Sequence, residues 1–453
     1  MTPPSPRIAE IRPRIFNVSA KTNWFFVSVH TDDGDDGAVG WGEASLNGRE
    51  PEIEAALARC AADCAGRAID AAQARLTVDA GAGLASNAAA SAIQQALVAL
   101  QAAFEGRPLH ALLGQLAREA VPVYANINRA TSLRTPEGFV ATARRAQARG
   151  YRGFKAAPFD GVSPANAGSR EGRRLVAHGI ACMLALREAL GPEVRLMVDC
   201  HWRFDEASAL DALRALAPAR LHWFECPLPE VPAHWPALRR LRAAARDQGV
   251  LLAAAETQVG VAAFQTLFDD ALYDVVMPDV KYCGGPREML RIAERAADAG
   301  VRFSPHNPTG PVCTQHSLHV AAVAPECEGL EMQFDESPLC EEAVARGLPQ
   351  LVDGALVVPA GAGLALWLDE AVLAAHPYQR VPLGIESSGG GTGDNANVRE
   401  RIHLLLLDDV KRGLADITAG RTEDADTAIA RLQRARKPSS KSTKIIKTTK
   451  RRG

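Results

Sequence analysis

Residues 195–201 read Arg-Leu-Met-Val-Asp-Cys-His, a short apolar run that ends in side chains able to bind a metal or move a proton. The pattern returns at 221–227, where an apolar run is followed by Glu225. A short apolar run bounded by polar residues is typical of a strand that is buried on both faces, as in a parallel sheet. The repetition therefore predicts a fold built from successive strand–helix units.

Eight such runs occur from residue 121 onward, and helical periodicity separates most of them. The predicted strands are 121–125, 153–157, 195–198, 221–224, 251–255, 275–277, 301–304 and 329–332. The predicted helices include 136–149, 173–190, 207–216, 235–247, 262–268 and 287–299. Eight alternating units predict an α/β fold with a closed (β/α)8 barrel. An open doubly wound sheet is the alternative, but no Gly-x-Gly-x-x-Gly motif follows an early strand.

The flanking regions differ from this pattern. Residues 8–18 and 24–30 look like strands and 51–114 is Ala-rich and helical, which predicts an α+β domain over 1–118 before a barrel over 119–350. We expect the main fold to end near residue 384, because 387–393 has the Gly- and Ser-rich composition of a flexible linker. A helical stretch near 398–436 and a basic end complete the region 385–453. Residues 431–453 hold ten positive side chains and no acid.

Composition excludes several classes of protein. The 453 residues have a formal net charge of −2 and contain no run of 18 apolar residues, so we expect no membrane span. The N-terminus lacks the basic and apolar regions of a secretory signal. The nine cysteines are scattered and form no Cys-x-x-Cys pair, which favours reduced thiols in a cytoplasmic protein.

Acidic side chains follow three successive strands at the same end. Asp199, Glu225 and Glu256 are separated by 26 and 31 residues, each about one strand–helix unit. Because the carboxyl ends of barrel strands surround one rim, the three carboxylates are expected to converge. Any one alone is more simply a helix N-cap or a loop residue, but together they form an oxygen-only ligand set that suits Mg²⁺.

Histidines lie at two of the same strand ends. His201 follows Asp199 by two residues, and residues i and i+2 of a strand face the same way, which would point His201 into the site. The alternative for His201 is a packed or capping histidine. Asp279 and His306 end neighbouring strands. A carboxylate that accepts from one ring nitrogen orients a histidine and raises its basicity, so His306 is a candidate general base.

Together these residues resemble the enolase superfamily, and within it the mandelate racemase group and its galactonate-dehydratase-like acid-sugar dehydratases. The resemblance extends over about 1–378. Its segments are Gly40-Trp41-Gly42-Glu43-Ala44, the helix over 92–114, Phe154-Lys155, Asp199-Cys200-His201, Phe224-Glu225-Cys226-Pro227, Ala255-Glu256, Pro278-Asp279 with Gly284-Gly285, Ser304-Pro305-His306-Asn307-Pro308 with Gly310-Pro311, and Pro359-Ala360-Gly361-Ala362-Gly363-Leu364. It implies a modified (β/α)8 TIM barrel whose N-terminal α+β capping domain is completed by a C-terminal segment, here 351–384.

The resemblance also implies roles. Mg²⁺ is the expected cofactor, with Asp199, Glu225 and Glu256 as its ligands. His306, oriented by Asp279, would remove the proton α to a substrate carboxylate. The further catalytic residues are Lys155, which would orient or neutralise that carboxylate, Glu331, which would hydrogen-bond to it, and His201, which would protonate a leaving β-hydroxyl.

The implied function is dehydration of a sugar acid, an aldonate or aldarate, to a 2-keto-3-deoxy acid. One departure bears on this. Many members carry Lys-x-Lys on the second strand, whereas the second position here is Ala157. A racemase that uses this lysine as a base is therefore disfavoured. A racemase or epimerase with His306 and His201 or Lys281 as its two bases remains the alternative.

Lysine is scarce, since only Lys21, Lys155 and Lys281 precede residue 411. A bias towards arginine explains the low number. An ammonium can lose its proton where a guanidinium cannot, so the remaining lysines are candidates for the site. The candidate substrate contacts are Lys21, Trp24, Lys281, Asn126 and Asn128, with Arg129 as a weaker one. For Lys21 and Lys281 a loop lysine is the alternative, and His316 and His319 are expected to be packing residues.

The expected partner is a small-molecule carboxylate substrate, and we expect no membrane partner. The family resemblance implies a homo-oligomer. An alternative from a different class of function is a scaffold protein that has a vestigial site and acts through its tail. The basic end could bind nucleic acid by charge alone, but it lacks interleaved aromatic residues, so a solvated tail is favoured over nucleic-acid binding.

Overall fold

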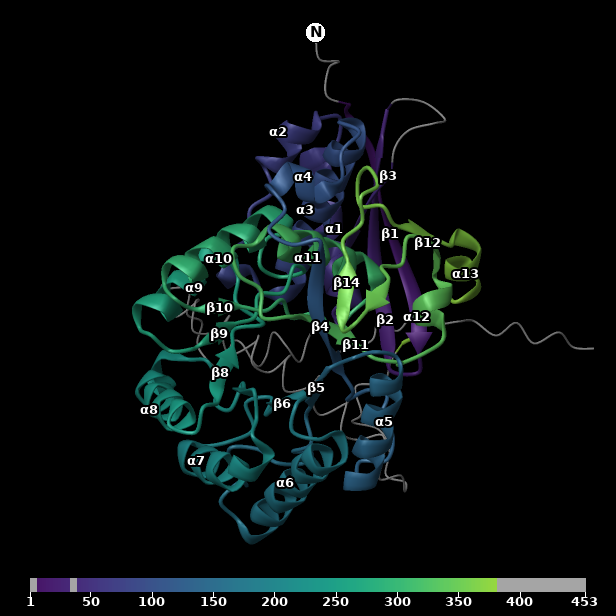
Figure 1. Cartoon of the computed structure of the whole chain (residues 1–453). Coiled ribbons are helices and arrows are strands. Elements are labelled where there is room, and N and C mark those ends of the chain that lie inside the picture. Colours follow the sequence, from purple (N-terminus) through teal and green to yellow (C-terminus); the bar gives the residue numbers. More distant parts are fainter. Residues whose placement is uncertain (1–5, 33–38, 381–453) are drawn as a thin grey trace, which may run out of the picture.

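A computed structural model of the chain describes residues 6–32 and 39–380 (Figure 1). It contains a capping domain, drawn in purple and blue, and a barrel, drawn mainly in teal and green. The linker, the helical stretch and the basic tail predicted for residues 385–453 lie outside the described residues. None of the helices in the described part of the chain is both long and apolar enough to cross a membrane.

The capping domain is built on an antiparallel sheet in the order β1-β2-β3. Its strands are β1 (Ile8–Ser19), β2 (Thr22–Thr31) and β3 (Val39–Glu43), and its helices are α1 (Glu50–Cys64), α2 (Ile69–Gln73), α3 (Leu84–Phe104) and α4 (Leu109–Leu113). Alternation along β2 sends Phe25 and Val27 into a core with α1 and α3, whereas Trp24 and Phe26 enter a second core. The sheet is therefore covered on both faces.

Glycine lets β3 lie directly on α3. A Cβ atom placed on Gly42 would lie 1.9 Å from the carbonyl oxygen of Ala92, so no larger residue fits there without moving the helix. This contact explains the glycines of the Gly40–Glu43 segment and places Glu43 at the end of β3, beside the barrel.

The barrel contains the eight predicted parallel strands. They are β4 (Ala120–Asn126), β5 (Gly153–Ala156), β6 (Arg195–Asp199), β7 (Trp223–Glu225), β8 (Leu251–Ala254), β9 (Val275–Val276), β10 (Arg302–Phe303) and β11 (Leu330–Gln333). Neighbours pair in chain order, and β11 returns to pair with β4. The last gap is closed by backbone hydrogen bonds from Glu328 N to Phe303 O (2.8 Å) and from Glu331 N to Pro305 O (3.3 Å). The predicted capped barrel is confirmed.

Helices follow the first seven strands. They are α5 (Pro136–Ala148), α6 (Arg170–Leu190), α7 (Glu206–Ala215), α8 (Trp235–Arg246), α9 (Gly260–Asp269), α10 (Pro286–Asp298) and α11 (Pro311–Val323). Short 3-10 turns cover Ala80–Ala82, Ala217–Ala219 and Pro232–His234. In the described residues, the only helix between β11 and the return of the chain to the cap is the short α12 (Leu339–Glu342). This short helix in place of a full eighth helix is the modification of the barrel.

The C-terminal segment packs partly on the barrel and partly on the capping domain. β13 (Leu351–Val352) and β14 (Ala355–Val357) form a hairpin, and β14 pairs antiparallel with the start of β4. In contrast, β12 (Val344–Arg346) pairs with β15 (Trp367–Leu368), and α13 (Glu370–Ala375) follows. Figure 1 shows β12 and α13 beside the cap strands. The return to the cap thus begins before residue 351 and is interrupted by a hairpin on the barrel.

Strand alternation sets the floor of the barrel beneath its polar rim. Met197 and Trp223 point inward and pack with Tyr124 in a small interior cluster, while Val198 and Phe224 point outward into the main core. The inward positions two residues further along β6 and β7 are Asp199 and Glu225. The rim carboxylates therefore stand on an apolar floor that keeps water away from them on that side.

Candidate active site

Three carboxylates converge at the carboxyl ends of β6, β7 and β8. One oxygen from each of Asp199, Glu225 and Glu256 lies within 4.8 Å of the others, and all three side chains are buried. Burial raises the pKa of Glu225 to about 8 and that of Glu256 to about 7, because a buried carboxylate is costly to ionise and its acidic neighbours repel it. A hard divalent cation would relieve both penalties, so this donor set fits such an ion.

Lys155 lies at the side of this cluster. Its Nζ is 2.6 Å from Glu225 Oε1 and 2.8 Å from Glu331 Oε1, and the residue is 1% exposed. Burial opposes the ammonium, but the two carboxylates outweigh burial and raise the pKa of Lys155 well above its usual value. Lys155 is therefore a fixed positive charge that lowers the pKa of Glu331 and limits the rise in the pKa of Glu225.

Glu331 occupies the interior of the barrel, as predicted from the eighth strand. Oε1 also accepts a hydrogen bond from Asn126 Nδ2 (2.7 Å), and Oε2 accepts one from Asn307 N (3.1 Å). Burial would raise the pKa of Glu331, but the charges of Lys155 and His306 and the hydrogen bonds from Lys155 and Asn126 lower it. The nearby Glu336 faces elsewhere, towards the cap.

The Asp–His pair forms across β9 and β10. His306 Nδ1 lies 2.8 Å from Asp279 Oδ2, and Nε2 lies 3.5 Å from Glu256 Oε2. Burial disfavours the imidazolium, but Glu256 and Asp279 outweigh burial and raise the pKa of His306 to about 9. Asp279 thus orients the ring so that its other nitrogen faces the acidic cluster.

His201 reaches the opposite side of the cluster. Its Nε2 lies 2.8 Å from Asp199 Oδ2 and its backbone N–H donates to Asp199 Oδ1 (2.9 Å). The predicted reason for its direction, alternation along a strand, is wrong, because β6 ends at Asp199 and His201 has a left-handed φ of 47°. Trp202, Cys226 and Ala255 have left-handed φ values at neighbouring strand ends. Such conformations cost about 1–3 kcal/mol each and are found where the surroundings enforce them, often at functional sites.

Lys281 points to the Asp–His pair. Its Nζ lies 2.8 Å from Asp279 Oδ2, the oxygen that also contacts His306, and the side chain is 3% exposed. Burial opposes its charge, but Asp279 raises its pKa. In this arrangement Lys281 supports Asp279; a substrate contact or a role as second base stays a prediction.

The remaining candidate substrate contacts differ in what they touch in the structure. Asn126 joins the cluster through Glu331, whereas Asn128 Oδ1 accepts a hydrogen bond from Ala157 N (2.8 Å) and so braces the start of the next loop. Lys21 lies in the turn between β1 and β2. Trp24 is 3% exposed and packs between Phe16 and Phe26, which gives it a packing role.

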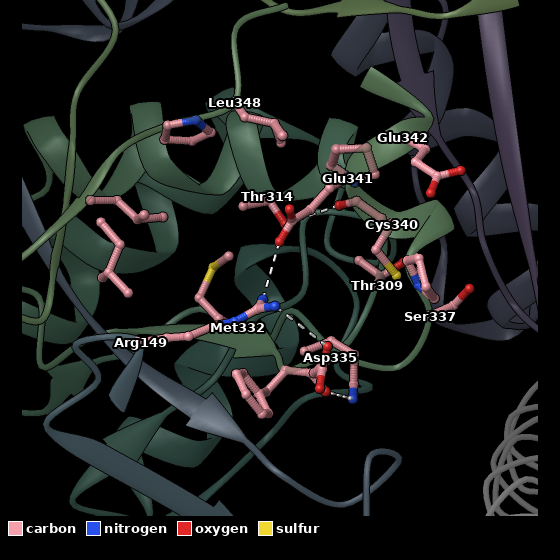
Figure 2. A pocket seen from close by; sticks show the side chains of 18 of the residues that line it. Arg149, Thr309, Thr314, Met332, Asp335, Ser337, Cys340, Glu341, Glu342 and Leu348 are labelled. Atoms are coloured by element: carbon pink, nitrogen blue, oxygen red, sulfur yellow. Dashed lines mark hydrogen bonds and ion pairs between the residues drawn. The ribbon is translucent and has the colours of Figure 1, made fainter. Parts of the chain in front are cut away.

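A cavity of about 670 Å³ lies outside the barrel interior, between β11, the start of α11 and α12 (Figure 2). Figure 2 shows Arg149 at its edge, directed towards Glu341 and Asp335. Among the predicted site residues only Trp24 lines it. The cavity is thus separate from the acidic cluster.

Two buried carboxylates were not assigned a role from the sequence. From the sequence, Glu43 is part of a motif only and Glu336 has no assigned role, yet each connects the cap to the barrel. No strand-end rule points to either residue. A possible signal for Glu43 was its place after two glycines at the end of an edge strand.

The fold and the site define a capped (β/α)8 barrel with an acidic cluster and an Asp–His pair at the carboxyl ends of its strands. The model of the mandelate racemase / muconate lactonizing enzyme N-terminal domain matches residues 9–114, and that of the enolase C-terminal domain-like fold matches residues 138–372. The chain belongs to the enolase superfamily, in its mandelate racemase group.

Curated relatives agree with this assignment. The chain is 31% identical over 401 residues to a D-galactonate dehydratase family member of Streptomyces bingchenggensis, covering 82% of this chain and 93% of the relative. It is 31% identical over 304 residues to a D-gluconate dehydratase of Thermoproteus tenax, covering 66% of this chain and 59% of that relative. The match thus spans less than two thirds of the gluconate dehydratase.

A solved structure shows the same architecture. A mandelate racemase/muconate lactonizing enzyme-like protein from Rubrobacter xylanophilus superposes with a TM-score of 0.72 at 28% sequence identity. The superposition covers 83% of this chain and 99% of that protein.

Proposed function

We propose that the protein is a Mg²⁺-dependent dehydratase of a sugar acid, an aldonate or aldarate. One observation carries the proposal: two histidines border the acidic cluster at opposite ends. His201 contacts the β6 carboxylate Asp199, and His306 lies beside the β8 carboxylate Glu256. β-Elimination needs one group that removes the α-proton and another that protonates the leaving hydroxyl, which is what a pair placed in this way can provide.

Asp199, Glu225 and Glu256 would hold the metal ion. When bound there, Mg²⁺ would act as a Lewis acid on the substrate carboxylate and make the α-proton more acidic. Lys155 favours the ionised form of Glu225, the form that can act as a ligand. Glu331, held by Lys155 and Asn126, offers a fixed acceptor on the same wall of the barrel.

The proton transfers follow from the two histidines. His306 Nε2, which is directed to the acidic cluster because Nδ1 faces Asp279, accepts the α-proton when the ring is neutral. The Cβ–O bond then breaks with its electron pair on oxygen, and His201 donates the proton that makes water the leaving group. Protonation of the resulting enol at C3 gives a 2-keto-3-deoxy acid. The dehydratase names of the relatives support this reaction.

The test is a library of aldonates and aldarates incubated with Mg²⁺ and scored for 2-keto acid. For an active compound in D₂O, His306→Asn should lose both Cα–H exchange and dehydration, whereas His201→Asn should keep exchange and lose dehydration. His178→Asn, an exposed histidine on α6, is the control. Exchange at Cα in the wild type with inversion and no loss of water would refute dehydration and identify an epimerase. Failure of every sugar acid would also count against the proposal.

A further inference from the structure

The carboxylate of Glu43 in the cap binds the loop that carries His306. Its Oε1 accepts hydrogen bonds from Thr309 Oγ1 (2.6 Å) and Gly310 N (2.9 Å), and its Oε2 accepts one from Cys313 N (3.0 Å). These three donors follow His306 by three to seven residues. Ser45 Oγ of the cap adds a fourth donor at 2.7 Å. One side chain thus joins the end of β3 to the loop after β10.

The fit around this carboxylate is close. Glu43 is 0% exposed, and within the described residues it has no ion-pair partner, so its charge is met by two hydroxyls and the first amides of α11. A Cβ atom on Gly310 would lie 2.7 Å from Glu43 Oε1 and 2.9 Å from Trp24 Cδ2. Glycine at 310 is therefore required for the carboxylate to reach the loop.

The second catalytic loop is also held by the cap. Gln95 of α3 accepts from Glu43 N (3.1 Å) and directs its amide to Val280 O (3.4 Å), between Asp279 and Lys281. Ser91 Oγ, one turn earlier on α3, accepts from Gly284 N (3.1 Å). The loops after β9 and β10, which carry the two members of the Asp–His pair, thus meet the same edge of the cap.

We propose that Glu43 is a positioning residue for His306, so that the cap sets the geometry of the base in addition to covering the site. The inference rests on the proposed function, because it takes His306 as the base. Displacement of a reacting group by about 1 Å can cost about 100-fold in rate. The groups that would hold substrate and metal stand on β5 to β8, directly after β8 and on β11, and the carboxylate of Glu43 makes its hydrogen bonds to other residues.

Glu336 provides a matched comparison. It is also a buried carboxylate that joins cap to barrel, but it accepts from Ser19 Oγ (3.0 Å) and Thr22 Oγ1 of the β1–β2 turn and pairs with Arg129 (2.9 Å). This turn contains Lys21. Glu336 thus joins this turn to the barrel through Arg129 and makes none of the contacts that Glu43 makes with the His306 loop. Because Lys21 is a candidate substrate contact, loss of Glu336 should weaken substrate binding rather than slow the chemical step.

The experiment compares Glu43→Gln with Glu336→Gln in the full chain on the most active sugar acid. In Glu43→Gln an amide nitrogen must face at least one N–H or O–H donor, so the loop shifts. We expect kcat to fall about 10- to 100-fold, KM to change less than about threefold, and the isotope effect on kcat with α-deuterated substrate to grow. Glu336→Gln should raise KM several-fold with kcat within about threefold. Thr309→Val, which removes one donor from the barrel side, is a milder variant in case Glu43→Gln does not fold.

The outcomes separate the two proposals. A folded Glu43→Gln or Thr309→Val with wild-type kcat and an unchanged isotope effect would overturn the positioning role and leave dehydration standing. If the wild type converts no sugar acid, dehydration fails, and the positioning role is judged by imidazole ¹⁵N resonances assigned with His306→Asn. Glu43→Gln must then shift the His306 resonances while Glu336→Gln leaves them in place; unchanged resonances in Glu43→Gln would refute the positioning role.

Discussion

The contact between cap and barrel should weaken in acid because it contains a neutral buried histidine. His316 of α11 contacts Trp41 O on β3 through Nε2 (2.9 Å), and its Nδ1 is buried with no hydrogen-bond partner in the described structure. Protonation would place an N–H with no acceptor and a charge in this interior. Burial accordingly lowers the pKa of His316 to about 4, from an unfolded value near 6.5.

The direction and size of the change in stability with pH follow from these two pKa values. The unfolded chain binds the proton more readily, so the contribution of His316 is complete above pH 6.5 and is lost as the pH falls from 6.5 towards 4. Each pH unit in this window costs about 1.4 kcal/mol, so lowering the pH from 7.5 to 5.0 should remove about 2 kcal/mol through His316 alone. His319, whose pKa is lowered to about 3 by burial, and its neighbour His110 add to the same trend.

The assay is urea unfolding followed by tryptophan fluorescence at pH 7.5 and 5.0. His316→Gln keeps an amide donor for Trp41 O but cannot be protonated, so it should lose about 2 kcal/mol less than the wild type over this range. The exposed His178→Gln should behave as the wild type does. Equal losses in the wild type and in His316→Gln would refute the reasoning, because the acid sensitivity would then come from other groups.

Two further changes test the charge network. Lys155→Met leaves Glu225 and Glu331 without their shared cation in a buried site, and urea unfolding at pH 7.5 should show a loss of about 3–5 kcal/mol; a loss below about 1 kcal/mol would contradict the assigned role. Glu328→Gln removes a carboxyl whose pKa is lowered to about 2, chiefly by its hydrogen bond with His222, so its contribution is complete above the usual pKa of 4.5 and is lost as the pH falls towards 2. At pH 7 the free energy of unfolding of the variant should be lower than that of the wild type by up to about 3 kcal/mol, and near pH 2.5 the two values should be nearly equal. A difference that does not shrink in acid would exclude this linkage.

Periodicity along the chain was enough to predict the barrel and the position of its acids. One strand–helix unit separates Asp199 from Glu225, so parallel pairing places the two residues side by side, and the structure pairs them directly. The same rule predicted His306 beside Asp279. These predictions were possible because they depend on strand order and alternation, which are repetitive properties of the sequence.

Contacts that depend on local backbone or on distant segments were not predictable in this way. His201 reaches Asp199 through a left-handed turn and not through strand alternation. Of the two partners of Lys155, Glu331 on β11 follows only from closure of the barrel. The periodicity of strands and helices in the sequence predicts neither the φ angle of a single residue nor a contact between side chains that are 70 or more residues apart.

The sequence by itself determined the eight strands and the residue types at their ends, because each follows from patterns within about 30 residues, and motifs spread over about 1–378 determined the family. Tertiary structure alone decided how the cap meets these ends. Glu43 lies 267 residues before Gly310 and meets it because β3 packs on α3 and the C-terminal segment returns to the cap. A buried carboxylate needs donors that surround it, and only the folded chain brings those donors together.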